Sequence, residues 1–192
     1  MPRHKEFDQN KVLDKAIELF WRQGYHATSI QHLVAHLGIS RSSLYDTFGD
    51  KHSLFLSALT RYTQQGSSHT KQVLGTKLGY EAIELLFEGL VEQAVNDSLC
   101  RGCFIANSTT ELAVNDDQVA NKVYRNRCDY EALFYDFLVR AQANGEVSAK
   151  HDARALARFL FSAIQGIAVI AKTRPERQVL EDIVNVTLSV LR

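Results

Sequence analysis

Four side chains in one short segment could form hydrogen bonds with a nucleic acid: Arg41, Ser42, Ser43 and Tyr45. An arginine can donate two parallel hydrogen bonds to the edge of a guanine, or it can bind a phosphate. Serine hydroxyls are short and suit contacts with phosphates or with bases. The cluster therefore indicates DNA binding, provided that the fold exposes these side chains on one surface.

The elements that would position this cluster are two short helices joined by a tight turn. Ser40 can cap a helix over residues 41–48, and Gly38 tolerates the positive φ that a sharp turn needs. Thr28 or Ser29 can cap the preceding helix. That helix carries apolar residues at helical spacing: Ile30, Leu33, Val34 and Leu37. The pair predicts a helix-turn-helix, whose second helix enters the DNA major groove. A helical hairpin with a purely structural role is the alternative.

Three stretches of the chain carry a family resemblance: AIELFWRQGYHATSI (16–30), HLGISRSSLYDTF (36–48) and GDKHSLF (49–55). Together they resemble the N-terminal domain of the TetR family of bacterial transcriptional regulators. The resemblance covers roughly the first third of the chain. It implies that Tyr45 packs at the DNA backbone and that Lys51 binds a phosphate. Thr28 and Ser29, at the start of the first helix of the pair, are expected to contact phosphates too.

Asp46 departs from the pattern of that family, whose members often have histidine or another neutral residue there. A carboxylate close to phosphates is repelled unless it accepts a hydrogen bond from a cytosine amino group or pairs with a basic neighbour. Asp46 therefore puts the recognised base sequence in doubt, and not the mode of binding.

The net charge of the chain is zero, which limits its non-specific affinity for DNA. The first 60 residues contain seven Lys and Arg against six Asp and Glu. The charge is unevenly placed, because Arg3, His4 and Lys5 precede the first predicted helix. Helix N-termini also bind phosphate without formal charge, and a dimer would double each contribution.

Composition and periodicity predict an all-α protein with about nine helices. The chain has 192 residues, of which 45% are hydrophobic, and only two prolines, so long uninterrupted helices are possible. We expect a DNA-binding domain over residues 1–52 and a larger helical domain over 53–192. Besides the helix-turn-helix, the predicted helices cover residues 8–23, 50–65, 81–95, 103–113, 116–144, 153–172 and 176–191, with Pro175 in the first turn of the last.

The chain shows no run of 18 consecutive apolar residues, and no signal peptide precedes its charged start. We therefore expect a cytoplasmic protein without a membrane-spanning segment. The sequence also lacks a cluster of acids or histidines that would chelate a metal, and we expect neither a metal nor a cofactor.

Aromatic residues crowd the middle helices of the larger domain and could line a cavity for a small effector. The resemblance implies that an effector would bind between these helices, and we expect it to be small and mostly apolar or aromatic. Core packing is the alternative role for each aromatic residue. The candidate ligand-binding residues are Phe87, Cys103, Phe104, Asn107, Tyr124, Phe134 and Gln165.

The three cysteines are Cys100, Cys103 and Cys128. The first two form a CxxC, but no second CxxC or spaced histidine pair accompanies it, which argues against zinc. Cys103 is predicted to begin a helix close to Arg101, an environment that favours the thiolate. A thiol-based sensor of oxidants or electrophiles is therefore an alternative to a reversible effector. Burial as small hydrophobic residues is the structural alternative.

The last two predicted helices carry more apolar surface than a monomer core needs. Small residues among them permit close approach of helices, which favours a two-fold, four-helix interface between two copies. The alternative is that these residues complete the monomer core. The candidate interface residues are Phe159, Ala163, Ile167, Ile183 and Val186.

These features and the resemblance together predict a homodimeric regulator, not an enzyme, because no nucleophile–base pair, phosphate loop or metal constellation stands out. We expect its partners to be a double-stranded, palindromic DNA operator and a small effector that releases the protein from it. A repressor is the preferred interpretation, and an activator is the alternative, since the position of the operator decides between them.

Overall fold

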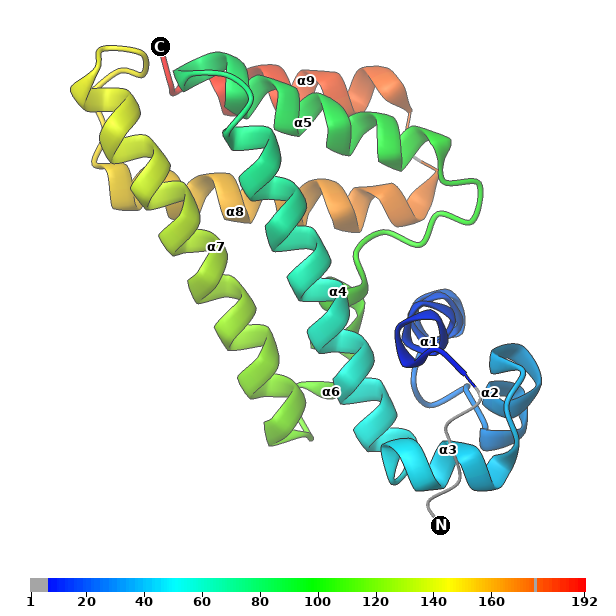
Figure 1. The fold of residues 1–192 in the computed structure, drawn as a ribbon. Coiled ribbons are helices and arrows are strands. Elements are labelled where there is room, and N and C mark those ends of the chain that lie inside the picture. Colours follow the sequence, from blue (N-terminus) through cyan, green and yellow to red (C-terminus); the bar gives the residue numbers. More distant parts are fainter. Residues whose placement is uncertain (1–6, 175) are drawn as a thin grey trace.

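The structure, a computed structural model, describes residues 7–174 and 176–192, and these residues form nine α-helices and one short 3-10 helix (Figure 1). The prediction of an all-α fold with about nine helices is confirmed. Pro175 and the basic residues Arg3, His4 and Lys5 lie outside the described residues. The α-helices are α1 (Gln9–Gln23), α2 (Ile30–Leu37), α3 (Arg41–Phe48), α4 (Lys51–Leu74), α5 (Gly79–Asn96), α6 (Phe104–Leu112), α7 (Asp117–Ala143), α8 (Ala153–Ile170) and α9 (Arg177–Ser189), and the 3-10 helix η1 (Ala171–Thr173) follows α8.

Side-chain caps explain where most helices begin. The side chains of Asp8, Ser40 and Asp50 accept hydrogen bonds from backbone N–H groups in the first turns of α1, α3 and α4. Ser29, rather than Thr28, caps α2. Gly38 adopts a left-handed conformation (φ 71°) after α2, which turns the chain sharply toward α3. These local signals were readable from the sequence.

Helix α4 ends at Leu74, beyond the predicted end near residue 65. The polar segment GSSHTKQ does not break the helix because its polar side chains lie mainly on the exposed face. Thr70 and Leu74 continue the buried face of α4, with 4% and 8% of their surfaces exposed. Tertiary packing therefore extends α4 through a segment whose composition is typical of a loop.

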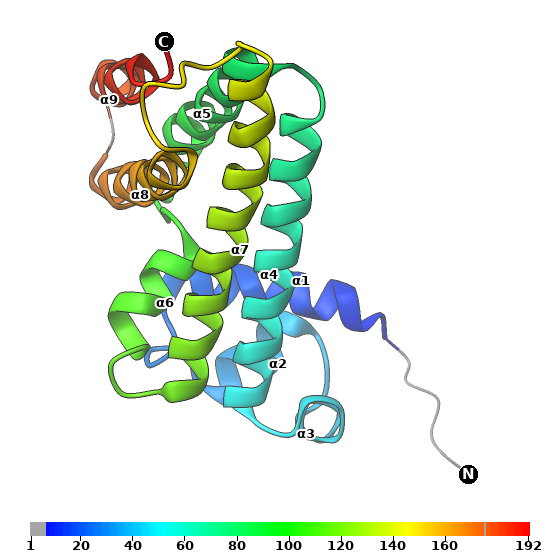
Figure 2. The same ribbon diagram turned by 90° about the vertical axis from the view of Figure 1, so that its left-hand side faces the viewer.

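The helices form two groups with separate cores. Helices α1–α3 lie at one end of the molecule, α5, α8 and α9 lie at the other, and α4 and α7 run side by side between them (Figures 1 and 2). The core around α1–α3 also includes Phe55 and Leu59 from α4, Phe104 and Leu112 from α6, and Val119 from α7. Helices α4 and α7 contribute to both cores, whereas the buried residues of α6 belong to the core around α1–α3.

One helical stretch of the described chain, Ala153–Thr173, is long and apolar enough to cross a membrane by length and composition. It packs against α7, and Leu156, Leu160 and Ile167 contribute to the core. A single stretch of this kind that supplies core residues is typical of a helix inside a globular protein.

Candidate nucleic-acid interface and cavity

Helix α3 presents a polar face to solvent, while Leu44 and Phe48 pack against the core around α1–α3. Leu44 is fully buried, whereas Arg41, Ser42 and Tyr45 are exposed. The Arg41 guanidinium lies 5.8 Å from the centre of the Tyr45 ring, close enough for a cation–π interaction. This arrangement holds two of the predicted DNA-contacting side chains together on one outward surface.

The two serines of α3 are linked to the cap of the helix. The hydroxyls of Ser42 and Ser43 lie 2.9 and 2.8 Å from the Ser40 hydroxyl. Ser42 is exposed and Ser43 is half-buried. At the start of α2, Ser29 is exposed and forms a reciprocal capping box with His32. Ser29, Ser42 and Ser43 can each still reach a phosphate or a base edge, because every hydroxyl has further hydrogen-bonding capacity.

The prediction for the side chain of Thr28 is wrong. This side chain is fully buried, its hydroxyl donates to the carbonyl of Gly24 (2.5 Å), and it accepts from the Gln23 amide (3.2 Å). These bonds close the turn between α1 and α2, so the hydroxyl faces inward. From the sequence alone, Thr28 and the adjacent cap Ser29 look equally able to face DNA. Only the geometry of the turn shows that the Thr28 hydroxyl points into the protein.

The amino group of Lys51 is directed mainly at the protein. Its Nζ donates to the carbonyls of Tyr25 (3.0 Å) and Thr28 (2.9 Å) and lies 4.1 Å from the centre of the Tyr25 ring. Burial lowers the pKa of this amine. A lysine ammonium has three donors, so one remains for a phosphate. The first role of Lys51 in the structure is to hold the α1–α2 turn, which the family resemblance alone did not suggest.

Glu111, near the end of α6, also binds this turn. Its carboxylate accepts from the backbone N–H groups of Tyr25 (3.1 Å) and His26 (2.9 Å). A side chain at Gly24 would approach this carboxylate to 2.9 Å, and Gly24 also has a positive φ of 82°. The glycine therefore allows α6 to lie close to the turn. Sequence reasoning missed Glu111, because its partners lie about 85 residues away.

The start of α6 is tied to α1 as well. The carbonyl of Arg101 accepts from the Trp21 indole (3.1 Å) and from the Asn107 amide (3.0 Å). The Arg101 guanidinium also stacks over the Trp21 ring at 4.5 Å. Helix α6 is thus fastened to the N-terminal helices at both of its ends.

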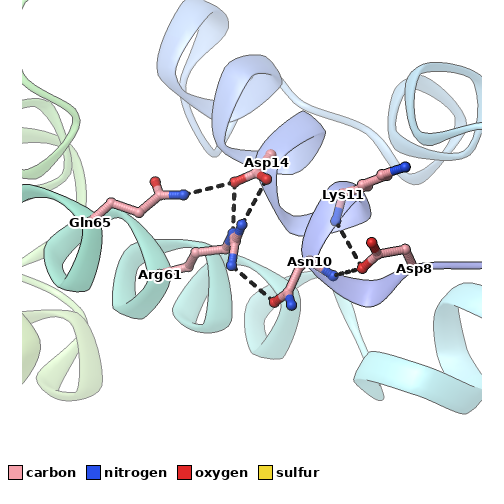
Figure 3. A network of polar contacts seen from close by, with 6 residues as sticks. All are labelled: Asp8, Asn10, Lys11, Asp14, Arg61 and Gln65. Atoms are coloured by element: carbon pink, nitrogen blue, oxygen red, sulfur yellow. Dashed lines mark hydrogen bonds and ion pairs between the residues drawn. The ribbon is translucent and has the colours of Figure 1, made fainter.

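A polar network joins α1 to α4 (Figure 3). Arg61 donates to both carboxylate oxygens of Asp14, at 2.6 and 2.7 Å, and to the side-chain oxygen of Asn10 at 2.9 Å. Gln65 donates to Asp14 at 3.0 Å. The bond with Arg61 lowers the pKa of Asp14. This fork-shaped pairing fixes the angle between α1 and α4 more tightly than a single ion pair would.

A cavity of about 360 Å³ lies between α4, α5, α7 and α8, with the start of α6 as part of its wall. Its walls are mostly apolar, which is typical of sites for small organic molecules. Within the described part of the chain, Asp97 is the only carboxylate of the lining, and it is paired with Arg101 at 3.2 Å. No lysine or arginine of the described residues lines the cavity.

Only two of the seven predicted ligand-binding residues, Cys103 and Gln165, line this cavity. The predictions for the other five are not supported by the geometry. Three of these five, Phe87, Phe104 and Phe134, are almost fully buried in the two cores, and Tyr124 is 58% exposed. The side-chain amide of Asn107 donates to the carbonyl of Arg101 and accepts from the Lys172 amino group. Helical spacing identifies a buried face, but it does not say whether that face meets packed side chains or a cavity.

Tyr130, one of the aromatic residues expected to offer a cavity wall, does line it, but the sequence reasoning missed several other lining residues: Tyr62, Thr70, Asn126 and Phe161. One of them carried a signal. Asn126 interrupts an apolar stripe of α7 that otherwise reads Val119, Val123, Tyr130 and Phe134. A polar residue on the buried face of a helix is uncommon and points to a specific partner.

Cys103 lies on the cavity wall immediately before α6, and its sulfur is 3.8 Å from the Tyr62 hydroxyl. All three cysteines are free, and Cys100 has an unusual positive φ of 48°. Among the described residues, no group of three His, Cys, Asp or Glu could hold a metal ion.

The outer faces of α8 and α9 carry exposed apolar side chains. Phe159, Val169, Val179 and Val186 are between 43% and 70% exposed. Ala163 and Ile183 are partly buried at the edge of the core. Ile167, in contrast, is only 2% exposed and belongs to the monomer core, so its predicted place in a dimer interface is wrong.

Comparison with known protein families matches both halves of the chain. The model of bacterial regulatory proteins of the TetR family matches residues 12–58, and that of the tetracyclin repressor-like C-terminal domain matches residues 79–186, more than half of the chain. The chain belongs to the TetR family. The family resemblance drawn from its first third is thereby confirmed, and this TetR-family chain is a transcriptional regulator.

Relatives and solved structures agree with the TetR assignment. The chain is 39% identical over its whole length to a Bacillus subtilis (strain 168) protein named "Uncharacterized HTH-type transcriptional regulator YezE", all of which it covers. It is 32% identical to the HTH-type transcriptional repressor ComR of Escherichia coli (strain K12), over 97% of this chain and 90% of ComR. A solved structure of the TetR-family regulator CifR, a cysteine mutant complexed with 26-bp double-strand operator DNA, matches with a TM-score of 0.86 and 29% identity over 100% of both chains.

Proposed function

We propose that the protein is a homodimeric repressor that binds a palindromic operator through α3 and releases it when a small effector enters the cavity. The observation that carries this proposal is the polar face of α3, held outward by buried Leu44 in a chain of the TetR family. The ComR relative is named a repressor, and the CifR neighbour was solved on operator DNA. Binding to chromosomal DNA implies a cytoplasmic location.

The proposed contacts with DNA divide into two kinds. Arg41 and Ser42 on α3 are exposed and can reach base edges or phosphates in the major groove. Ser29, Ser43, Tyr45 and the remaining donor of Lys51 contact the backbone and set the register of α3. Two copies related by a two-fold axis would place their α3 helices about one turn of DNA apart, so the operator is an imperfect palindrome.

The dimer is proposed to form through the outer faces of α8 and α9. Phe159 and Val186 are large, apolar and exposed on these two helices. Gly166 of α8 is exposed as well, and a Cβ added there would meet nothing within 4 Å, so a second backbone could approach closely. A two-fold interface that covers such a surface on both copies would be a four-helix arrangement.

Coupling between the cavity and the DNA is proposed to run through α4 and α6. Both helices contribute to the cavity wall and to the core around α1–α3. An effector weakens DNA binding only by its different affinity for the two conformations. A coupling free energy of roughly 3 kcal/mol would lower operator affinity about a hundredfold.

Fluorescence anisotropy with DNA from upstream of the protein's own gene tests the proposal. Wild type, Arg41→Ala and a control, Lys77→Ala, are titrated across a salt series; Lys77 is exposed in the connection between α4 and α5, far from α3 in the fold. We expect specific binding that weakens steeply with salt, a loss of about 1–3 kcal/mol in Arg41→Ala, and little change in the control. A folded dimer that shows no specific binding at low salt would overturn the proposal.

A thiol-based sensor is the second candidate, because the Cys103 sulfur lies on the cavity wall beside the Tyr62 hydroxyl. In that mechanism an oxidant or electrophile modifies Cys103 and the same DNA-binding module is released. The variant Cys103→Ser separates the two triggers in the anisotropy assay. A reversible effector would still release DNA from this variant, whereas an oxidant or electrophile would not.

A further inference from the structure

The side-chain amide of Asn126 is the most unusual polar group in the cavity. Asn126 is only 8% exposed and lies on the cavity wall. Among the described residues its side chain has no hydrogen-bond partner, and its amide is not among the completely buried polar groups that lack a partner. Buried amides in native proteins almost always have a partner, so this one is available to a bound molecule.

Besides Asn126, the cavity lining contains several uncharged hydrogen-bonding groups. The hydroxyls of Tyr62, Thr70 and Tyr130 and the thiol of Cys103 belong to the same lining. Burial raises the pKa of Tyr62 and of Tyr130, so both phenols stay protonated near neutral pH and can donate. Gly66 leaves room for the Tyr130 hydroxyl, because a Cβ there would lie 2.9 Å from it.

The charges around the cavity disfavour an ionised ligand. Asp97 is the only carboxylate that residues 7–174 and 176–192 contribute to the lining, and its charge is already neutralised by Arg101. No lysine or arginine of the lining could balance a carboxylate, and His69 is exposed at the edge of the cavity. An ion that left water for this site would lose hydration and would gain only uncharged hydrogen-bond partners, without a balancing charge.

Size sets a further limit. A cavity of about 360 Å³ has room for an organic molecule of about a dozen non-hydrogen atoms, if the molecule fills the space somewhat less densely than side chains fill a protein core. Gln65 and His69 of α4 and Gly89 and Gln93 of α5 are the exposed members of the lining, which places the opening between these two helices.

We propose that the effector is an uncharged, mostly aromatic molecule that carries a carboxamide-like group, with adjacent hydrogen-bond donor and acceptor, and that Asn126 pairs with that group. The molecule's carbonyl accepts from the Asn126 amide nitrogen, and its N–H donates to the Asn126 oxygen. The carboxylic acids that correspond to such carboxamides are ionised near neutral pH and are expected not to bind in the cavity. This inference rests on the proposed role of the cavity as the effector site.

Calorimetric titration of the purified full-length protein tests the pairing with three matched sets of probes. Each set holds an aromatic carboxamide, its carboxylate and its parent hydrocarbon: benzamide, 2-naphthamide and biphenyl-4-carboxamide with their counterparts. We expect at least one carboxamide to bind about tenfold tighter than its hydrocarbon and its carboxylate. In Asn126→Leu, which fills similar space without polar atoms, the carboxamide should lose that advantage over its hydrocarbon.

The control variant is Gln165→Leu, because Gln165 is a second lining amide that is only half-buried. It should retain most of the preference for the carboxamide. The proposal is overturned if a carboxylate binds as tightly as its carboxamide, if the preference survives in Asn126→Leu, or if none of the probes binds to a folded dimer. Operator binding measured on the same samples shows separately whether the regulator function itself fails.

Discussion

The exposed polar face of α3 and the cavity differ in the number of helices that form them. The exposed side chains of α3 come from one eight-residue helix whose cap, turn and anchor are neighbours in sequence. The cavity wall combines side chains from α4, α5, α7 and α8 with the start of α6. A surface that is built locally depends little on distant packing, whereas the shape of the cavity depends on the relative positions of long helices. Damage to the distant core should therefore affect the two sites differently.

The largest effect is expected from Phe134→Ala in the core beside the cavity. Phe134 is fully buried, so its truncation should lower the free energy of unfolding by about 4 kcal/mol. At a temperature where the variant is still folded, α3 should keep its structure and operator affinity should change little. Urea denaturation and anisotropy on the same preparation measure both quantities. A large loss of operator affinity in the folded variant would show that α3 is not locally determined.

A second, smaller effect tests the connection between the regions. Glu111→Ala removes the acceptor of two backbone N–H groups in the α1–α2 turn, and we expect a loss of about 1–2 kcal/mol in unfolding free energy. Hydrogen exchange at the amides of Tyr25 and His26 should accelerate, while exchange in α8 should not. Glu88→Ala, on the exposed side of α5, is the matched control. Unchanged exchange at the turn would argue against α6 as a connecting element.

The smallest effect concerns pH and the α1–α4 network. Arg61 lowers the pKa of Asp14 below its ordinary value of 3.8, so the pairing stabilises the fold at higher pH. That contribution is complete above the ordinary pKa and is lost as the pH falls through the lower folded-state value. Asp14 is partly exposed, so solvent screens the pair, and Asp14→Asn should cost only about 0.5–1 kcal/mol at pH 7.

Thermal denaturation of wild type and Asp14→Asn across pH 2.5–7 measures this effect. The two curves should differ near neutral pH and converge at the acid end, where Asp14 of the wild type is protonated. A constant difference across the whole range would mean that the ionised form of Asp14 contributes nothing.

Residues at the α1–α2 turn illustrate where local patterns mislead. Thr28 and Ser29 are adjacent and chemically alike, yet Ser29 is an exposed cap and Thr28 is fully buried. Lys51 begins α4, where the sequence suggests an amino group free to bind a phosphate, but in the structure this group donates to two carbonyls of the turn. A sequence reveals which groups can form hydrogen bonds, but it does not reveal which of several partners lies nearest.

Caps, the turn glycine and helical periodicity made α1–α3 and the outward face of α3 predictable, because these features depend on residues within one or two turns of each other. The aromatic residues of the larger domain were identified as buried, but which of them face the cavity was not. Phe87 and Phe134 fill the core, while Asn126 and Phe161 line the cavity. A small rotation of one long helix exchanges these roles without changing its apolar pattern. Only the packing of the helices against one another settles which side chains face the cavity.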